Sequence, residues 1–133
     1  MTKDEIMAME PGPEIEMLIA EHVLKWRKVA GPKTDYDGPC EQYDVLVPPS
    51  VDNPFSVYPP RGSIKPWYFC MQWSRNFREA WEVFEKITDG GIVRRMPDGK
   101  YYCSFAGGEL ISAETAPLAI CKAALLAVRE AQG

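Results

Sequence analysis

The hydrophobic pattern between residues 74 and 105 predicts a helix that leads into a two-stranded hairpin. Apolar side chains recur at helical spacing after residue 76 and form one stripe, which consists of Phe77, Ala80, Trp81, Phe84 and Ile87. Ser74 is predicted as the helix N-cap, because its hydroxyl can accept a hydrogen bond from a first-turn N–H group. After two glycines, runs rich in β-branched and aromatic residues flank the turn sequence Asp98-Gly99. Since this helix must bury its stripe against the hairpin, we interpret Phe77, Trp81 and Phe84 as core residues.

A second helical stripe starts at Pro13, a residue that is tolerated in the first turn of a helix. The spacing predicts a helix that ends near residues 26–28. Its apolar face consists of Ile15, Leu18, Ile19, His22, Val23 and Trp26. The charged residues Glu14, Glu16, Glu21, Lys25 and Arg27 are expected on a solvated side.

Capping signals mark two further helical segments. Thr2 and Glu5 form a capping-box pattern that predicts a short helical turn. Thr115 is expected to cap the last helix, with Pro117 in its first turn. Apolar residues cover more than one face of that helix, which indicates that it is more buried than the helix that starts at Pro13.

The order helix, strands, helix, strands, helix predicts an α+β fold. We expect three helices against a mainly antiparallel sheet of about four to five strands. Residues 43–47 and 67–73 are expected as strands, and residues 109–113 are either a third strand of the hairpin meander or an irregular approach to the last helix. The region 31–66 holds eight of the twelve prolines and is interpreted as a loosely packed insertion, with a ligand lid as the alternative.

Length and composition fit a single domain over residues 1–133 with a real hydrophobic core, since 46% of the residues are apolar. The net charge of −4 and the pI near 5.0 argue against a dedicated nucleic-acid-binding protein. No segment is long and apolar enough to span a membrane, and the N-terminus lacks an apolar signal region. We therefore expect a soluble protein inside the cell.

The four cysteines are expected to be free and reduced. Cys40, Cys70, Cys103 and Cys121 contain no CxxC pair, so a zinc site has little support and no cofactor is predicted. Cys103 in a strand pattern and Cys121 in a helix pattern are expected to pack as small hydrophobic groups.

Four segments together carry a resemblance to a known family. They are Asp-Glu-Ile-Met-Ala-Met-Glu at 4–10, the helix that closes on Trp26, Trp-Ser-Arg-Asn-Phe-Arg-Glu-Ala-Trp-Glu-Val at 73–83, and Thr-Ala-Pro-Leu-Ala-Ile-Cys-Lys-Ala-Ala-Leu-Leu at 115–126. In these segments the chain resembles the phage ABA sandwich domain, a family of small phage and prophage proteins. The resemblance implies an α/β/α sandwich, and the family has no established activity and no catalytic residues to transfer. A protein of this kind is expected in the cytoplasm of the host cell. The chain departs from the family pattern in its long Pro-rich region 31–66, and in Ser74-Arg75-Asn76, where a Ser-Thr-Asp cap is usual.

The sequence contains no recognisable catalytic set. A serine or cysteine nucleophile needs a base, and the single histidine, His22, lies on an apolar helical stripe. Four aspartates in loop-rich sequence could bind a hard cation, although their spacing matches no EF-hand and we favour solvated loop acids; they are Asp35, Asp37, Asp44 and Asp52.

Arginines and aromatic residues form the other candidate set. Arg75, at the start of the predicted central helix, could hold an anion together with free N–H groups. Trp67 and Trp73 could stack on a base, and Arg78, Arg94 and Arg95 add positive charge. The simpler interpretation, which we favour, makes these arginines surface residues and these tryptophans core residues.

Three hypotheses for function follow. The first is a non-enzymatic phage protein that binds a host protein or a small nucleotide-like ligand. The second is a metal-dependent enzyme that acts on a nucleotide or phosphoester through Asp35, Asp37 or Asp44. The third is a weak nucleic-acid binder that uses Arg75, Arg78, Arg94 and Arg95. A homodimer is a further hypothesis, because exposed sheet edges and apolar faces could pair with a second copy of the chain.

Overall fold

The C-terminal helix α4 (Ala116–Gln132) is the element against which the rest of the chain packs. The computed structural model describes residues 2–30, 44–49, 72–87, 90–105 and 108–132. In this part of the chain, α4 contacts all three strands of the main sheet and each of the other helical segments. Its first eleven residues, 116–126, are all buried. Thr115 caps the helix as predicted, since its hydroxyl accepts a hydrogen bond from the Leu118 N–H at 3.4 Å.

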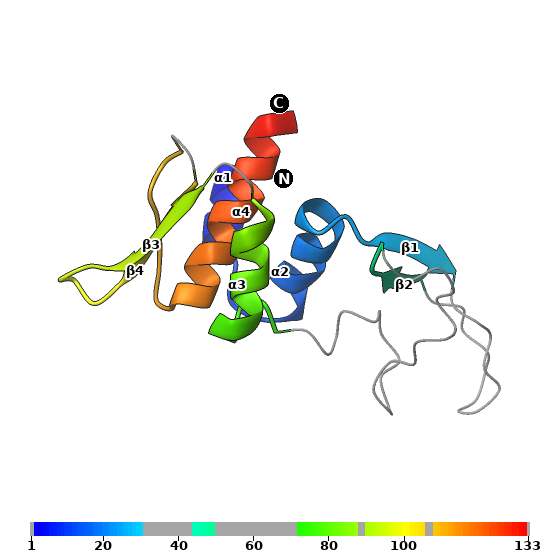
Figure 1. The fold of residues 1–133 in the computed structure, drawn as a ribbon, viewed down its shortest axis with the longest axis horizontal. Coiled ribbons are helices and arrows are strands. Elements are labelled where there is room, and N and C mark those ends of the chain that lie inside the picture. Colours follow the sequence, from blue (N-terminus) through cyan, green and yellow to red (C-terminus); the bar gives the residue numbers. More distant parts are fainter. Residues whose placement is uncertain (1, 31–43, 50–71, 88–89, 106–107, 133) are drawn as a thin grey trace.

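The N-terminal helical segments pack on α4 (Figure 1). Helix α1 (Lys3–Ala8) starts at the predicted cap, with the Thr2 hydroxyl accepting from the Glu5 N–H at 3.1 Å. Its Ile6 side chain is fully buried. The buried Lys122 of α4 donates to the Met7 carbonyl at 2.7 Å, and burial lowers the pKa of that amine. Thr2 therefore caps the short N-terminal helical segment that we predicted.

Helix α2 (Pro13–Leu18) continues as the π-helical segment η1 (Ile19–Val23). We predicted that this helix ends near residues 26–28, and the structure shows that this boundary is wrong. Lys25 adopts a left-handed conformation with φ 58°, and the Trp26 N–H reaches back to the Ala20 carbonyl at 2.8 Å. The chain then leaves as strand β1 (Arg27–Ala30), which pairs antiparallel with β2 (Asp44–Val47).

The main sheet is an antiparallel meander in the order β3-β4-β5. Its strands are β3 (Gly91–Arg95), β4 (Tyr101–Phe105) and β5 (Ile111–Ala113). The predicted turn is confirmed: Gly99 has φ 84°, the Asp98 carboxylate accepts from the Lys100 N–H, and it also accepts from the Tyr102 hydroxyl at 2.6 Å. This last bond lowers the pKa of Asp98 and raises the pKa of Tyr102.

Helix α3 (Phe77–Lys86) packs along α4 through Ala80 and Val83, which are both fully buried. Its start differs from the prediction, because Asn76 rather than Ser74 is the N-cap. The Asn76 side chain accepts from the Glu79 N–H at 3.3 Å, whereas the Ser74 hydroxyl is engaged elsewhere.

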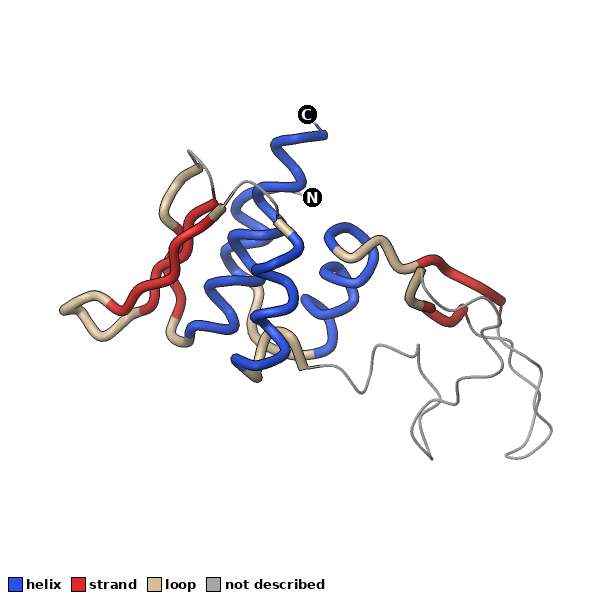
Figure 2. Tube along the Cα trace, viewed as in Figure 1, coloured by secondary structure: helices blue, strands red, loops and turns tan. Residues whose placement is uncertain are grey.

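The fold is α+β, as predicted, but the details of the prediction need correction. We expected three helices and one sheet of about four to five strands. The described residues form four α-helices and two separate sheets, one of three strands and one of two. Figure 2 shows the helices between the three-stranded sheet and the β1-β2 ribbon. The reason is that the helix does not continue to residues 26–28 as we predicted, and residues 27–30 instead provide a partner for the strand at 44–47.

Two other expectations concern strands. Residues 109–113 do contain the third strand of the meander, β5. In the expected strand at 67–73, residues 67–71 lie outside the described residues, and Trp73 lies in a turn. Most of the Pro-rich region 31–66 also lies outside the described residues, apart from 44–49.

Cys103 and Cys121 are free and buried in the core, as predicted. Burial raises the pKa of Cys103 to about 12. It also raises the pKa of Cys121, and the nearby carboxylate of Glu16 adds to that shift. Because only the thiolate is a good nucleophile, both groups are protonated and unreactive at neutral pH.

A thiol titration checks this assignment. In a Cys40→Ser/Cys70→Ser variant, Cys103 and Cys121 are the remaining thiols, and we expect neither to react with Ellman's reagent at pH 8 in the folded protein. Both should react within minutes in concentrated urea. Rapid labelling of the folded protein would show that the core opens to solvent around β4 or α4.

Candidate functional site

An open groove lies between α3 and the edge strand β3, with a volume of about 500 Å³. One wall is a row of aromatic residues at positions i, i+4 and i+7 of α3. The rings of Trp81 and Phe84 stack with a centroid distance of 4.6 Å, and Phe77 lies 5.9 Å from Trp81. The lining residues are Phe77, Trp81, Phe84, Gly91, Ile92, Val93, Arg94, Arg95, Tyr101 and Ala116.

The exposure of this aromatic row corrects the sequence interpretation. We placed Phe77 and Trp81 in the core, but they are 49% and 40% exposed. The buried side of α3 is formed by Ala80 and Val83, and the aromatic row is centred roughly 100° around the helix from them. The predicted apolar stripe of α3 therefore consists of two adjacent faces. Small residues on one face pack against α4, and large aromatic residues on the other face line the groove.

Gly91 lets β3 approach the aromatic rings that line the groove. A Cβ at this position would lie 2.8 Å from Phe105 Cδ1 and 3.0 Å from Phe84 Cε2. These two rings are themselves in contact, with centroids 5.4 Å apart. Phe105 is buried, so its ring has little freedom to move away.

Arg95 gives the groove its charge, and Arg94 adds positive charge on the other face of the same edge strand. Successive strand residues point to opposite faces of a sheet. Val93 pairs with the buried Cys103, so the face that carries Gly91, Val93 and Arg95 is the face toward the helices. Arg94 lies with Ile92 on the opposite face, and Ile92 is 58% exposed. The lining of the groove contains no aspartate or glutamate.

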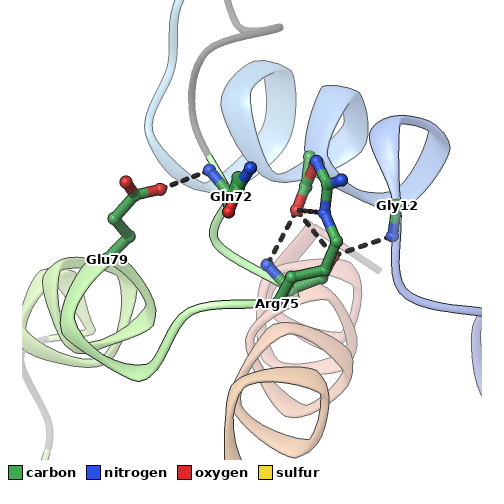
Figure 3. A network of polar contacts seen from close by, with 6 residues as sticks. Gly12, Gln72, Arg75 and Glu79 are labelled. Carbon is green, nitrogen blue, oxygen red and sulfur yellow. Dashed lines mark hydrogen bonds and ion pairs between the residues drawn. The ribbon is translucent and has the colours of Figure 1, made fainter.

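The other predicted arginine site is occupied by a buried carboxylate (Figure 3). Glu16, which we expected on a solvated helix side, is 1% exposed. Its Oε2 accepts from the Ser74 N–H at 3.1 Å, from the Ser74 hydroxyl at 2.7 Å and from Arg75 Nε at 3.2 Å. Its Oε1 accepts from Arg75 Nη2 at 2.7 Å. Glu16 is therefore an internal acceptor that connects α2 to the turn before α3.

Two further contacts complete this network. The Gly12 N–H donates to the Ser74 hydroxyl at 2.9 Å, and the Gln72 N–H donates to the Glu79 carboxylate. The hydrogen bond to Glu16 raises the pKa of Arg75. The Arg75 side chain is 38% exposed, but its guanidinium donates two hydrogen bonds to Glu16. We therefore assign Arg75 a structural role within the fold instead of the predicted role in anion binding.

The remaining predicted residues are distributed over different parts of the molecule. Trp73 is fully buried, and its ring makes an edge contact with Trp26 at 5.2 Å. Its indole Nε1 has no hydrogen-bond partner among the described residues. Arg78 is exposed on α3 but does not line the groove. Trp67 lies outside the described residues. Of the predicted set, the structure thus brings only Arg94 and Arg95 to the groove.

Of the histidine and the four aspartates considered for catalysis, the structure describes His22 and Asp44. The His22 side chain is 44% exposed beside Glu21. Asp35, Asp37 and Asp52 lie outside the described residues, and Asp44 begins β2. Among the residues that the structure describes, no group of three or more histidine, cysteine or acidic side chains could hold a metal ion. None of the described helices is long and apolar enough to cross a membrane.

Comparison with known proteins agrees with the resemblance in the sequence. The model of the phage ABA sandwich domain matches residues 17–125, so the chain belongs to this family. The fold is similar to the 2.0 Å crystal structure of a phage protein from Bacillus cereus ATCC 14579, with a TM-score of 0.53 and 28% sequence identity. This similarity covers 89% of the present chain and 91% of the other. No curated protein matches the chain.

The buried carboxylate generates a stability prediction. Glu16→Ala leaves the Ser74 N–H and hydroxyl buried without their acceptor, and an unsatisfied buried polar group costs about 1–3 kcal/mol. We expect the free energy of unfolding in urea to fall by about 3 kcal/mol, and by less for Glu16→Gln, which keeps one acceptor oxygen. The exposed Glu14 on the same helix is the matched control, and Glu14→Ala should change stability by less than about 0.5 kcal/mol. An equal effect at both positions would show that the network does not stabilise the fold.

The close approach at Gly91 generates a second prediction. Gly91→Ala adds a methyl group against Phe84 and Phe105, and overpacking of this kind typically costs about 1–3 kcal/mol. We expect a lower melting temperature for this variant and no significant change for Arg94→Ala, an exposed position on the same strand. A Gly91→Ala protein as stable as the wild type would mean that the two rings shift freely.

Proposed function

We propose that this chain is a phage accessory protein that acts by binding a host protein without chemical conversion, and that the α3–β3 groove is its binding site. The observation that carries the proposal is the exposed row of Phe77 and Trp81 beside an arginine-bearing edge strand. Large aromatic residues and arginine dominate the binding energy of protein interfaces. Their coincidence in one groove supports a role in recognition.

The lining of the groove supports binding over catalysis. General acid–base and nucleophilic catalysis use histidine, carboxylate, cysteine, serine, lysine or tyrosine side chains near the substrate. Of these types, the lining of the groove contains only tyrosine, as Tyr101, with no histidine, carboxylate or lysine beside it to exchange a proton. What it offers is apolar contact area, ring faces and the guanidinium of Arg95, with Arg94 on the other face of the same strand, and these groups can bind a partner without a proton transfer.

The openness of the groove favours a protein partner over a nucleotide-like ligand. Small-molecule sites usually enclose most of the ligand surface. This groove is instead bounded on one side by an exposed strand and on the other by the aromatic face of a helix. A nucleotide that stacks on Trp81 and pairs with Arg95 is the alternative that the experiment distinguishes.

Retention of a ligand by variants tests the proposal. Tagged wild-type protein, Trp81→Ala and Glu82→Ala are exposed to bacterial host lysate, and eluates are compared by native mass spectrometry before and after denaturation. Glu82 is an exposed neighbour on α3 that does not line the groove, so its variant is the matched control. We expect wild type and Glu82→Ala to retain one partner protein, and Trp81→Ala to lose it by at least about tenfold, as for an interface hot spot.

Each other outcome is informative. If the wild type releases a nucleotide on denaturation and Trp81→Ala does not, the partner is a small ligand and not a host protein. Equal retention by Trp81→Ala and wild type would move the site away from the groove. A wild-type protein that retains nothing above the level of an unrelated tagged protein would overturn the binding role.

A further inference from the structure

Strand β3 forms an edge of the main sheet, because the order β3-β4-β5 gives it a neighbour on one side only within the described residues. An edge strand carries N–H and C=O groups that can pair with another extended chain. The pattern of hydrogen bonds between β3 and β4 determines which residues of β3 have free N–H and C=O groups. The Met96 N–H donates to the Lys100 carbonyl at 3.0 Å, so that pair is a hydrogen-bonded one. Bonded and non-bonded pairs alternate in an antiparallel ladder.

The alternation leaves Gly91, Val93 and Arg95 with outward-facing backbone groups. Their partners Phe105, Cys103 and Tyr101 are the non-bonded positions of the β3-β4 ladder. The same three residues belong to the sheet face toward the helices, beside the aromatic row of α3. The unpaired backbone and the exposed aromatic rings therefore bound the same groove.

We propose that β3 accepts an extended segment of a partner protein as an added antiparallel strand in this groove, and that the segment is acidic at its N-terminal end and apolar at its C-terminal end. The inference rests on the binding role proposed above and specifies the chemistry of the partner. Strand addition of this kind takes affinity from main-chain hydrogen bonds and specificity from pockets for alternate side chains.

The side chains of β3 define the sequence of the added strand. Its residues opposite Arg95, Val93 and Gly91 point toward the helices, and the two between them point away. A carboxylate suits the position opposite Arg95, and an apolar residue the position opposite Val93. An aromatic ring suits the position opposite Gly91, because the rings of Phe84 and Phe105 reach the backbone there and offer it apolar contact. A second carboxylate opposite Arg94 gives the order acidic, acidic, apolar, polar, aromatic.

Charge distinguishes this partner from a second copy of the chain. The protein carries a net charge of −4, yet the groove contains two arginines and no carboxylate. Strand β3 of a second copy would bring two more arginines to the groove and no acid. Electrostatic complementarity therefore favours a foreign acidic segment.

The direct test uses a fluorescein-labelled peptide, Ser-Glu-Glu-Val-Thr-Phe-Ser, and fluorescence polarisation. In the added strand the valine N–H points to β3, whereas the threonine N–H points away from it. We expect N-methylation of the valine to weaken binding at least tenfold and N-methylation of the threonine to change it less than threefold. A Lys-Lys version in place of Glu-Glu should also bind at least tenfold more weakly.

Variants of β3 provide the complementary test. Arg95→Ala removes the guanidinium and keeps the outward N–H group, whereas Arg95→Pro removes both without touching the β3-β4 ladder. We expect Arg95→Pro to bind the peptide at least fivefold more weakly than Arg95→Ala, with thermal melts showing that both variants are folded. A Trp81→Ala protein should also lose the peptide.

The outcomes separate this inference from the proposed function. No binding of the peptide to wild type, or equal effects of the two N-methyl groups, would overturn strand addition. If a host protein were still retained in a Trp81-dependent manner, the binding role itself would stand. A concentration-dependent dimer in sedimentation that Arg95→Pro abolishes would place a second copy on the edge and overturn the acidic partner.

Discussion

The position of α3 depends on one buried carboxylate. Glu16 of α2 accepts hydrogen bonds from the backbone and hydroxyl of Ser74 and from the guanidinium of Arg75, and so attaches the turn before α3 to the N-terminal helices. Removing a carboxylate from water costs several kcal/mol, which these charge-assisted bonds offset. Because the Ser74 hydroxyl is committed to this network, Asn76 caps the helix, and α3 starts at Phe77. The carboxylate thus fixes the residue at which α3 begins and the place where it enters the helical layer.

That placement has a consequence for the surface. Helix α3 approaches α4 through its small residues Ala80 and Val83, and this close packing turns the row of Phe77 and Trp81 away from α4. Gly91 then allows the edge strand to lie against Phe84 and Phe105. The positions of small residues therefore shape the groove. Ala80 and Val83 allow α3 to pack closely on α4, and Gly91 allows β3 to lie against the rings of Phe84 and Phe105.

The sequence predicted the elements whose signals are local. Thr2, Thr115 and the Asp98-Gly99 turn act on backbone groups within a few residues, and all three are confirmed. The predictions failed where a distant partner decides. The spacing of Glu16 fits a solvated helix side, but Ser74 and Arg75, almost sixty residues away, make it an internal acceptor. We predicted that the helix reaches residues 26–28, yet it ends before the left-handed Lys25, and β2 pairs with residues 27–30 as a strand.

Residue type alone also did not predict which of the candidate site residues would come together. Arg94 and Arg95 could be singled out by residue type, because cationic residues on a hairpin suggest a contact surface. Arg75 and Trp73 have the same chemistry, but the structure uses them inside the fold. Phe77 and Trp81 were assigned to the core because a periodic stripe does not reveal how wide the face toward its neighbour is. A helix that packs through alanine and valine while its tryptophan stays 40% exposed leaves apolar area uncovered, at about 25 cal/mol per Å². A partner that covers this area would recover that free energy, and the arginines beside it select the charge of the partner.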